Sequence, residues 1–172
     1  MNTGAQDIPP RAIDSRRVKD RRALRFETFD DAIADARRCA EADRAGTLRR
    51  TGNWTTGQIL GHLAWWIDGG FDGYDFKTPW IVRVLTRAFK GVLLRRPIGP
   101  GMRMPGAPEG TYGVEKMSTE DGLARFVAAA QRLDRECPDR PNPALGPLTH
   151  AQWKHLHLRH AELHLSFLHP EG

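Results

Sequence analysis

Apolar residues recur every three or four positions along four segments of the chain, a spacing that places them on one face of an α-helix. Each segment begins with a hydroxyl residue followed three positions later by an acid or an amide, the pattern of a capping box. No segment alternates apolar and polar residues as a strand would. The pattern therefore predicts an all-α four-helix bundle, with helices over residues 28–45, 55–70, 118–136 and 149–168.

Glycine and proline mark the expected ends of these four helices. Gly46 is expected to end the first helix, and Gly69-Gly70 the second. Pro138 follows the third helix and Pro170 follows the fourth, where a proline cannot continue a helix.

The connection between the second and third helices is long and has two halves. Residues 79–96 have the pattern of an additional amphipathic helix, with Arg83, Arg87 and Lys90 on one face and apolar residues opposite. We expect its apolar face to cover one side of the bundle, with binding to a membrane surface as the alternative. Residues 97–113 are rich in glycine and proline and predict a long surface loop, a kind of segment that often has a function.

Composition and charge limit the classes of protein. The 172 residues carry a net charge of +5, and most of the excess lies before residue 25. Residues 1–24 lack apolar periodicity and are expected to form a flexible or loosely docked basic tail, followed by a single domain over 25–170. No nucleic-acid motif accompanies the charge, so nucleic acid is not an expected partner. The stretch between Asp75 and Glu109 has seven basic residues and no acid, which would suit an anionic ligand or an acidic partner, although a solvated helix face is the simpler interpretation.

Neither export nor a membrane span is expected. The arginine pair Arg16-Arg17 is not followed by an apolar region, and no apolar run approaches the ~20 residues that cross a bilayer. The two cysteines fit a reducing compartment, so the protein is expected to be cytoplasmic. Cys39 is interpreted as a core residue, and Cys137 has no base beside it in the sequence.

Histidines are the candidate chemistry of the sequence. Five of the seven lie in or at the start of the last predicted helix, and His160 and His164 are four positions apart on its inward face, with His157 on the same stripe. His62 is the histidine of the second helix and lies among apolar residues. Two imidazoles at i and i+4 with a third from a facing helix can chelate a divalent ion and leave a coordination position open. The alternatives are a buried polar network, or His157 in place of one of the three.

Two segments resemble a known superfamily. The run from Trp54 through Gln58 to His62-Leu63-Ala64-Trp65-Trp66 is similar to the second helix of the DinB/YfiT-like proteins, and residues 153–165 are similar to their last helix. Within that superfamily the chain looks most like the DUF1569 branch, as supported by Leu24-Arg25-Phe26-Glu27-Thr28 and by the residues from Pro147 to Trp153. The resemblance covers about residues 24–168.

The resemblance implies a DinB-type four-helix bundle whose metal ligands would be His62, His160 and His164. Its characterised members include metal-dependent thiol S-transferases and a mycothiol-dependent isomerase, and relatives often form homodimers. A divalent metal is therefore expected, with zinc or nickel favoured, and a small-molecule substrate such as a low-molecular-weight thiol. Many members, those of this branch included, have no assigned reaction.

Two functional hypotheses follow from these residues. The first is a metal-dependent enzyme, thiol S-transferase-like or hydrolytic, in which the ion activates a bound thiol or water. Gln58, His157 and Glu162 are candidates to orient its ligands, although a capping amide and a solvated acid are the simpler interpretations of Gln58 and Glu162. The second is a non-catalytic helical bundle in which the histidines form a polar network or a structural or vestigial metal site.

Overall fold

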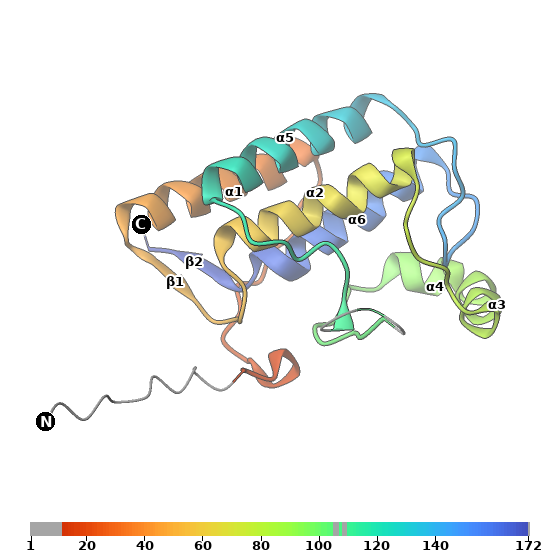
Figure 1. Ribbon diagram of the computed structural model, residues 1–172, viewed down its shortest axis with the longest axis horizontal. Coiled ribbons are helices and arrows are strands. Elements are labelled where there is room, and N and C mark those ends of the chain that lie inside the picture. The colour runs from red at the N-terminus through yellow and green to blue at the C-terminus, as the bar shows by residue number, and fades with distance from the viewer. Residues whose placement is uncertain (1–11, 105–106, 108–109, 172) are drawn as a thin grey trace, which may run out of the picture.

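Four long helices run roughly along one direction and pack around a common core (Figure 1). They are α1 (Phe29–Ala45), α2 (Thr56–Asp72), α5 (Thr119–Arg135) and α6 (His150–Leu165). The computed structural model describes residues 12–104, 107 and 110–171. Over these residues the protein is mostly helical and has one small two-stranded sheet, in agreement with the helical class expected from the sequence.

The capping residues expected from the sequence begin these helices. The Thr28 hydroxyl accepts from the Asp31 N–H, and the Asp31 carboxylate accepts from the Thr28 N–H in return. Thr55 with Gln58 and Thr149 with Gln152 form the same reciprocal pair. At α5 the Ser118 hydroxyl accepts from the Asp121 N–H. Each pair satisfies N–H groups that the first turn leaves without an intrahelical partner.

The second helix ends later than its glycines suggest. Gly46 caps α1 in the left-handed conformation as expected, but α2 continues through Gly69-Gly70 to Asp72, so the predicted stop is wrong. Gly69 makes room for a neighbour instead, because a Cβ there would lie 2.3 Å from the Tyr74 ring. The helix ends before Gly73, whose φ of 100° favours glycine.

A short antiparallel sheet closes one end of the bundle. Strand β1 (Leu48–Arg50) pairs with β2 (Leu168–Pro170), with Arg49 opposite His169. The sequence predicted no strand and extended the last helix to residue 168, and both expectations are corrected: α6 ends at Leu165. Three-residue strands are too short to show alternation, and their pairing joins segments far apart in the chain.

The core lies between the four long helices, where Phe29, Leu60, Leu133 and Trp153 are buried. Helices α2 and α5 lie close together where Gly122 faces Gly57. A Cβ on Gly122 would lie only 2.7 Å from the Gly57 carbonyl oxygen. This close approach fixes the position of the helix that carries His62.

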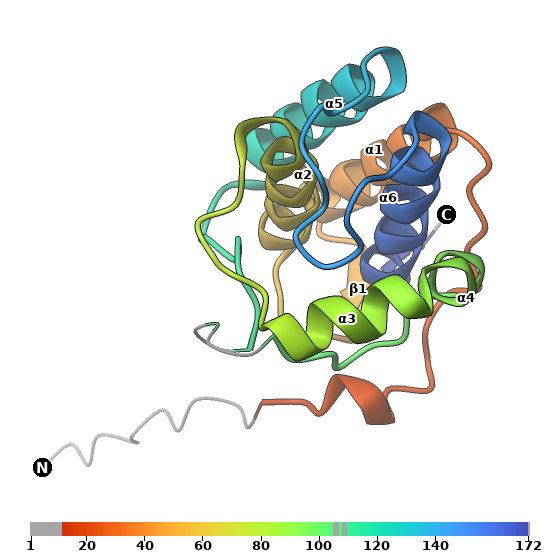
Figure 2. The same ribbon diagram turned by 90° about the vertical axis from the view of Figure 1, so that its right-hand side faces the viewer.

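The segment 79–96 forms two helices, α3 (Trp80–Ala88) and α4 (Lys90–Arg95), separated at Phe89. In both views they lie outside the long helices, on the side away from α5 (Figures 1 and 2). The expectation of one helix covering the bundle with its apolar face is wrong, since that face is exposed. A hydrogen bond from the Thr86 hydroxyl to the Ala144 carbonyl holds the other face of α3 against the protein.

The segment expected to be a loose tail divides into two parts. Residues 1–11 lie outside the described residues, whereas hydrogen bonds join Ile13 to Asn53 and Asp20 to Arg49. The Arg22 guanidinium donates to both oxygens of the buried Asp35 carboxylate at 2.8 and 2.6 Å, and the Arg22 N–H donates to the Ser166 carbonyl. A buried carboxylate needs such a partner, so Arg22 belongs to the folded domain.

Among the described residues, every helix is too short or too polar to cross a membrane.

Candidate metal centre

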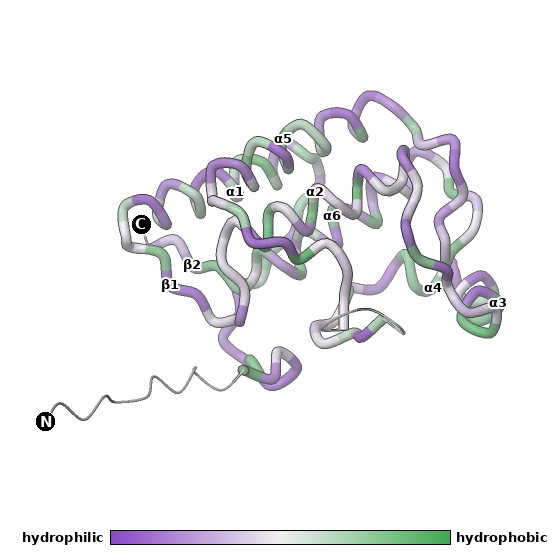
Figure 3. The backbone as a smooth tube through the Cα atoms, in the orientation of Figure 1, coloured by the Kyte–Doolittle hydropathy of each residue, from purple (hydrophilic) through white to green (hydrophobic). Residues whose placement is uncertain are grey.

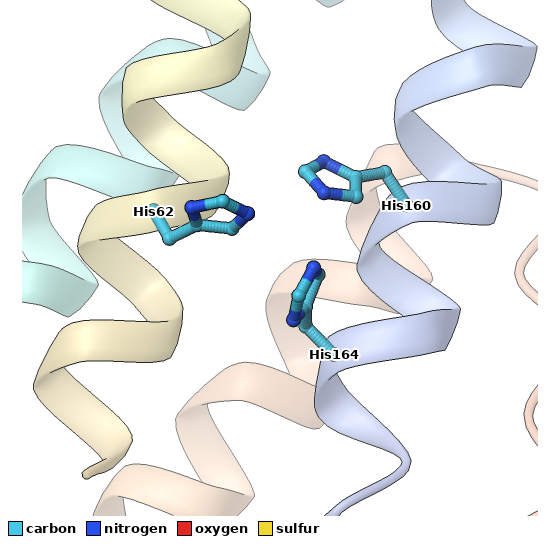
Figure 4. A group of neighbouring side chains, drawn as sticks. All are labelled: His62, His160 and His164. Atoms are coloured by element: carbon cyan, nitrogen blue, oxygen red, sulfur yellow. The ribbon is translucent and has the colours of Figure 1, made fainter. Parts of the chain in front are cut away.

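Three histidines converge between α2 and α6 (Figure 4). His62 comes from α2, and His160 and His164 come from successive turns of α6. One nitrogen from each lies within 4.8 Å of the others, so that the group could hold a metal ion. Across the described part of the chain, this is the one such group of three or more histidine, cysteine or acidic side chains.

The local helical geometry brings the three rings together. Residues four apart lie one above the other on a helix, and the His160 and His164 ring centroids are 4.6 Å apart. The His62 ring lies across the interhelical space, 5.1 Å from His160 and 4.6 Å from His164. His62 is buried, whereas His160 and His164 keep some exposed surface, so the group has an outer side.

The backbone of the long loop determines the tautomer of His62. Its Nδ1 lies 2.9 Å from the Tyr112 carbonyl oxygen. Because a carbonyl only accepts, Nδ1 carries the proton, and Nε2 is left with a lone pair. A metal-ligating imidazole is usually fixed by such a hydrogen bond from its other nitrogen. The sequence predicted a long loop over residues 97–113 but could not identify Tyr112, because the group involved is a main-chain carbonyl.

Burial keeps the imidazoles neutral. Loss of solvation lowers the pKa of His62 to about 4, although its hydrogen bond to Tyr112 acts in the opposite direction. The pKa values of His160 and His164 are also well below the usual histidine value, through burial first and through the neighbouring histidines second. Neutral imidazole is the form that binds a metal, so the group is ready to bind at neutral pH.

Aromatic rings surround the histidines. The Trp54 ring stacks on His164 at 5.2 Å and is tilted against His62 at 4.9 Å. Trp66 meets His62 and His160 edge-on, at 6.2 and 6.0 Å. These rings exclude water from the imidazoles and lower the local dielectric constant, which strengthens electrostatic interactions there.

Two of the three residues expected to orient the ligands make their hydrogen bonds elsewhere. The Gln58 amide accepts from the Thr55 N–H and so caps α2. Glu162 is buried, contrary to its interpretation as a solvated acid, because it accepts from the Phe26 N–H at 2.6 Å and pairs with Arg159 at 2.8 Å. The contact with Phe26 ties α6 to the segment before α1, whereas Arg159 lies on α6 itself.

His157 lies one turn before His160 on α6 and is buried. Its ring stacks on Trp153 at 5.8 Å, and its centroid is 6.5 Å from that of His160. It is not in the group of three whose nitrogens lie close together.

The cysteines lie apart from this group. Cys39 is buried in the core as expected, and burial raises the pKa of its thiol to about 12, so it stays protonated. Cys137 is exposed, and its thiol contacts the Pro138 carbonyl.

Fold and site together define a helical protein with a three-histidine group able to hold a metal ion. The family model described as Protein of unknown function (DUF1569) matches residues 18–171, and the chain belongs to this family. Comparison with the curated proteins and with the solved structures gave no match.

Proposed function

We propose that this protein is a metal-dependent enzyme in which His62, His160 and His164 hold a divalent cation. The observation that supports this proposal is the convergence of three neutral imidazoles from two helices, with no acid among them. Three neutral ligands leave the charge of the cation uncompensated and leave coordination positions for a further ligand. A small-molecule substrate with an anionic or ionisable group is the ligand that such a centre favours.

The proposed reaction is thiol transfer or hydrolysis. When bound, the divalent ion would lower the pKa of a coordinated thiol or water and so supply a nucleophile near neutral pH. The Tyr112 carbonyl holds the His62 proton on Nδ1, which keeps Nε2 available as a ligand. Trp54 and Trp66 shield the imidazoles from water. The partly exposed sides of His160 and His164 provide the direction from which a substrate would approach.

The bundle itself is proposed to be of the DinB/YfiT type. The four long helices pack around one core, and the histidines lie on the second and the last of them, where the resemblance places the ligands. Zinc and nickel are the favoured ions, because imidazole suits both.

Metal analysis of single variants tests the centre. The wild-type protein, stripped with a chelator and reloaded with Zn²⁺ or Ni²⁺, is expected to retain one ion per chain. His62→Ala, His160→Ala and His164→Ala are each expected to lose it. His155→Ala is the matched control, because His155 also lies on α6 but is not in the group. Wild-type retention no higher than that of His62→Ala would rule out the centre.

Cobalt substitution separates the enzyme from a structural metal site. A Co²⁺-loaded protein with an open position is expected to change its visible spectrum when a small thiol is added, with a sulfur-to-cobalt charge-transfer band. A protein that holds Co²⁺ but shows no spectral response to thiol or azide would instead have a closed, structural site, and the enzyme proposal would fail.

A further inference from the structure

Helices α3 and α4 carry a wide apolar face that points into solvent. The side chains on it are large, and each is between 44% and 72% exposed. They are Trp80, Ile81, Val84, Leu85, Phe89, Val92 and Leu93. Figure 3 shows the hydrophobic positions of α3 gathered on one side of the helix. Large exposed apolar side chains gathered on two neighbouring helices mark a surface that binds something.

The outward orientation of this face is set by contacts on the opposite side. The Thr86 hydroxyl donates to the Ala144 carbonyl at 2.7 Å, and the Lys90 ammonium donates to the Pro147 carbonyl at 2.9 Å. Val82 lies one turn before Thr86 and is partly buried. The side that carries Val82, Thr86 and Lys90 thus holds the helices against the rest of the protein, and the apolar side faces solvent.

Cations border the apolar face. Arg83, Arg87, Arg95 and Arg96 are exposed, and none of them forms an ion pair with an acid among the described residues. The sequence from residue 76 to residue 108 contains no acid at all. The surface therefore combines an exposed apolar helix face with positive charge that has no ion-pair partner among the described residues.

We propose that this surface docks the protein on an anionic lipid bilayer. A helix with arginine or lysine beside a face of tryptophan, phenylalanine and leucine lies in the plane of a membrane interface, with its apolar side chains among the acyl chains. Anionic headgroups would supply counter-charges that these arginines do not find among residues 12–104, 107 and 110–171. The bilayer would then bury the apolar side chains and pair with the cations at the same surface.

A second copy of the chain is a less suitable partner for this surface than an anionic bilayer. A two-fold interface brings the same patch of both copies together, so the arginines of one copy would face those of the other. An apolar face bordered only by cations cannot supply the opposite charges for itself. The charge pattern thus favours an anionic partner, and α3 lies along the outside of the long helices, where its length can rest on a flat bilayer (Figure 2).

Vesicle sedimentation with the full chain tests the proposal. The protein is expected to bind vesicles of phosphatidylcholine mixed with phosphatidylglycerol, to bind vesicles of phosphatidylcholine alone weakly, and to be released by salt. Val84→Glu/Leu85→Glu is expected to abolish binding. Ala124→Glu/Ala128→Glu is the matched control, because it adds the same charge to an exposed face of α5.

A second pair of variants tests the cations. Each basic residue near an anionic surface multiplies partitioning by about fivefold, so Arg83→Gln/Arg95→Gln/Arg96→Gln is expected to weaken binding by about 100-fold. Arg37→Gln/Arg125→Gln/Arg135→Gln removes the same charge from exposed positions of α1 and α5 and is expected to leave binding unchanged. In the wild type, vesicles should shift tryptophan emission to the blue, and Trp80→Phe should remove that shift.

Three results would overturn the proposal. The first is no binding to vesicles of either composition. The second is equal binding to neutral and anionic vesicles. The third is a dimer by light scattering that Val84→Glu/Leu85→Glu dissociates, which would assign the face to a second copy of the chain.

Discussion

The Nδ1 of His62 and the carbonyl oxygen of Tyr112 lie 2.9 Å apart, so a loop 50 residues further along the chain sets the protonation of a helical histidine. The loop can hold this position because it is packed in place by aromatic contacts. The Tyr112 ring stacks on Phe76 at 4.6 Å and lies parallel to Trp65. The proposed centre thus depends on three elements, two helices and one loop.

Displacement of this loop is expected to weaken metal binding without unfolding the bundle. Gly113 has a φ of 73°, and a Cβ there would lie 2.7 Å from the Trp65 ring. Gly113→Ala should therefore move the Tyr112 carbonyl and lower metal affinity by about 10–100-fold, the usual cost of losing a group that orients a ligand. Competition with a chromophoric chelator measures this affinity.

Gly99→Ala is the control for the loop variant. Gly99 lies in the same connection, and a Cβ there has open space around it. Its metal affinity should match the wild type. Unchanged affinity in Gly113→Ala would show that the Tyr112 hydrogen bond has no part in metal binding.

Removal of any one of the three histidines is expected to reduce metal affinity by more than ~100-fold, beyond what a change in an orienting group costs. His157→Gln should keep its metal, because His157 is outside the group. Isothermal titration with Zn²⁺ measures the metal affinity of the three ligand variants and of His157→Gln. If His157→Gln lost the ion and His160→Ala kept it, His157 would replace His160 as the third proposed ligand.

The metal-free protein is expected to lose stability as the pH falls below about 6.5. Burial lowers the pKa of His157 to about 3 and that of His62 to about 4, whereas both titrate near 6.5 when unfolded. Below pH 6.5 the unfolded chain binds protons that the folded chain does not, so the free energy of unfolding decreases by up to ~1.4 kcal/mol per pH unit for each histidine. Above this range, these groups contribute no pH dependence.

Urea denaturation at a series of pH values checks this expectation. His157→Phe removes one titrating group, so its stability should decline less steeply with falling pH than that of the wild type. Parallel curves for the two proteins would contradict the assigned cause.

Asp35→Asn is expected to destabilise the fold by about 3–5 kcal/mol, the cost of breaking a buried ion pair from one side. Asp35 is 1% exposed and receives hydrogen bonds from both Arg22 and Arg38. Asp14→Asn is the control, since the Asp14–Arg16 pair is exposed and such pairs contribute about 0–1 kcal/mol. Equal melting temperatures for the two variants would refute the structural role of Arg22.

Local signals in the sequence were sufficient to predict where the long helices begin. Thr28, Thr55 and Thr149 each cap a helix through a residue three positions away, and that interaction needs no distant partner. The spacing of His160 and His164 similarly determines that they share a helix face.

Features that depend on distant residues could not be predicted. The pairing of Leu48 with Pro170 joins segments far apart in the sequence and leaves no periodic pattern. The amphipathic pattern of 79–96 identified a helix with two faces, but which face meets the protein is decided by Thr86 and the backbone at Ala144. Arg22 looked like one of many charges in a basic tail, because its partner Asp35 could not be recognised as buried.

The contacts of Arg22 also determine the order in which the protein can fold during synthesis. Its guanidinium donates to the Leu165 carbonyl, 143 positions later, and its N–H donates to the Ser166 carbonyl. Strand β1 likewise waits for residues 168–170. A ribosome must therefore translate through α6 before Arg22 can make these two contacts. The segment before α1 and strand β1 therefore reach their final positions only at the end of synthesis, after the four long helices have been made.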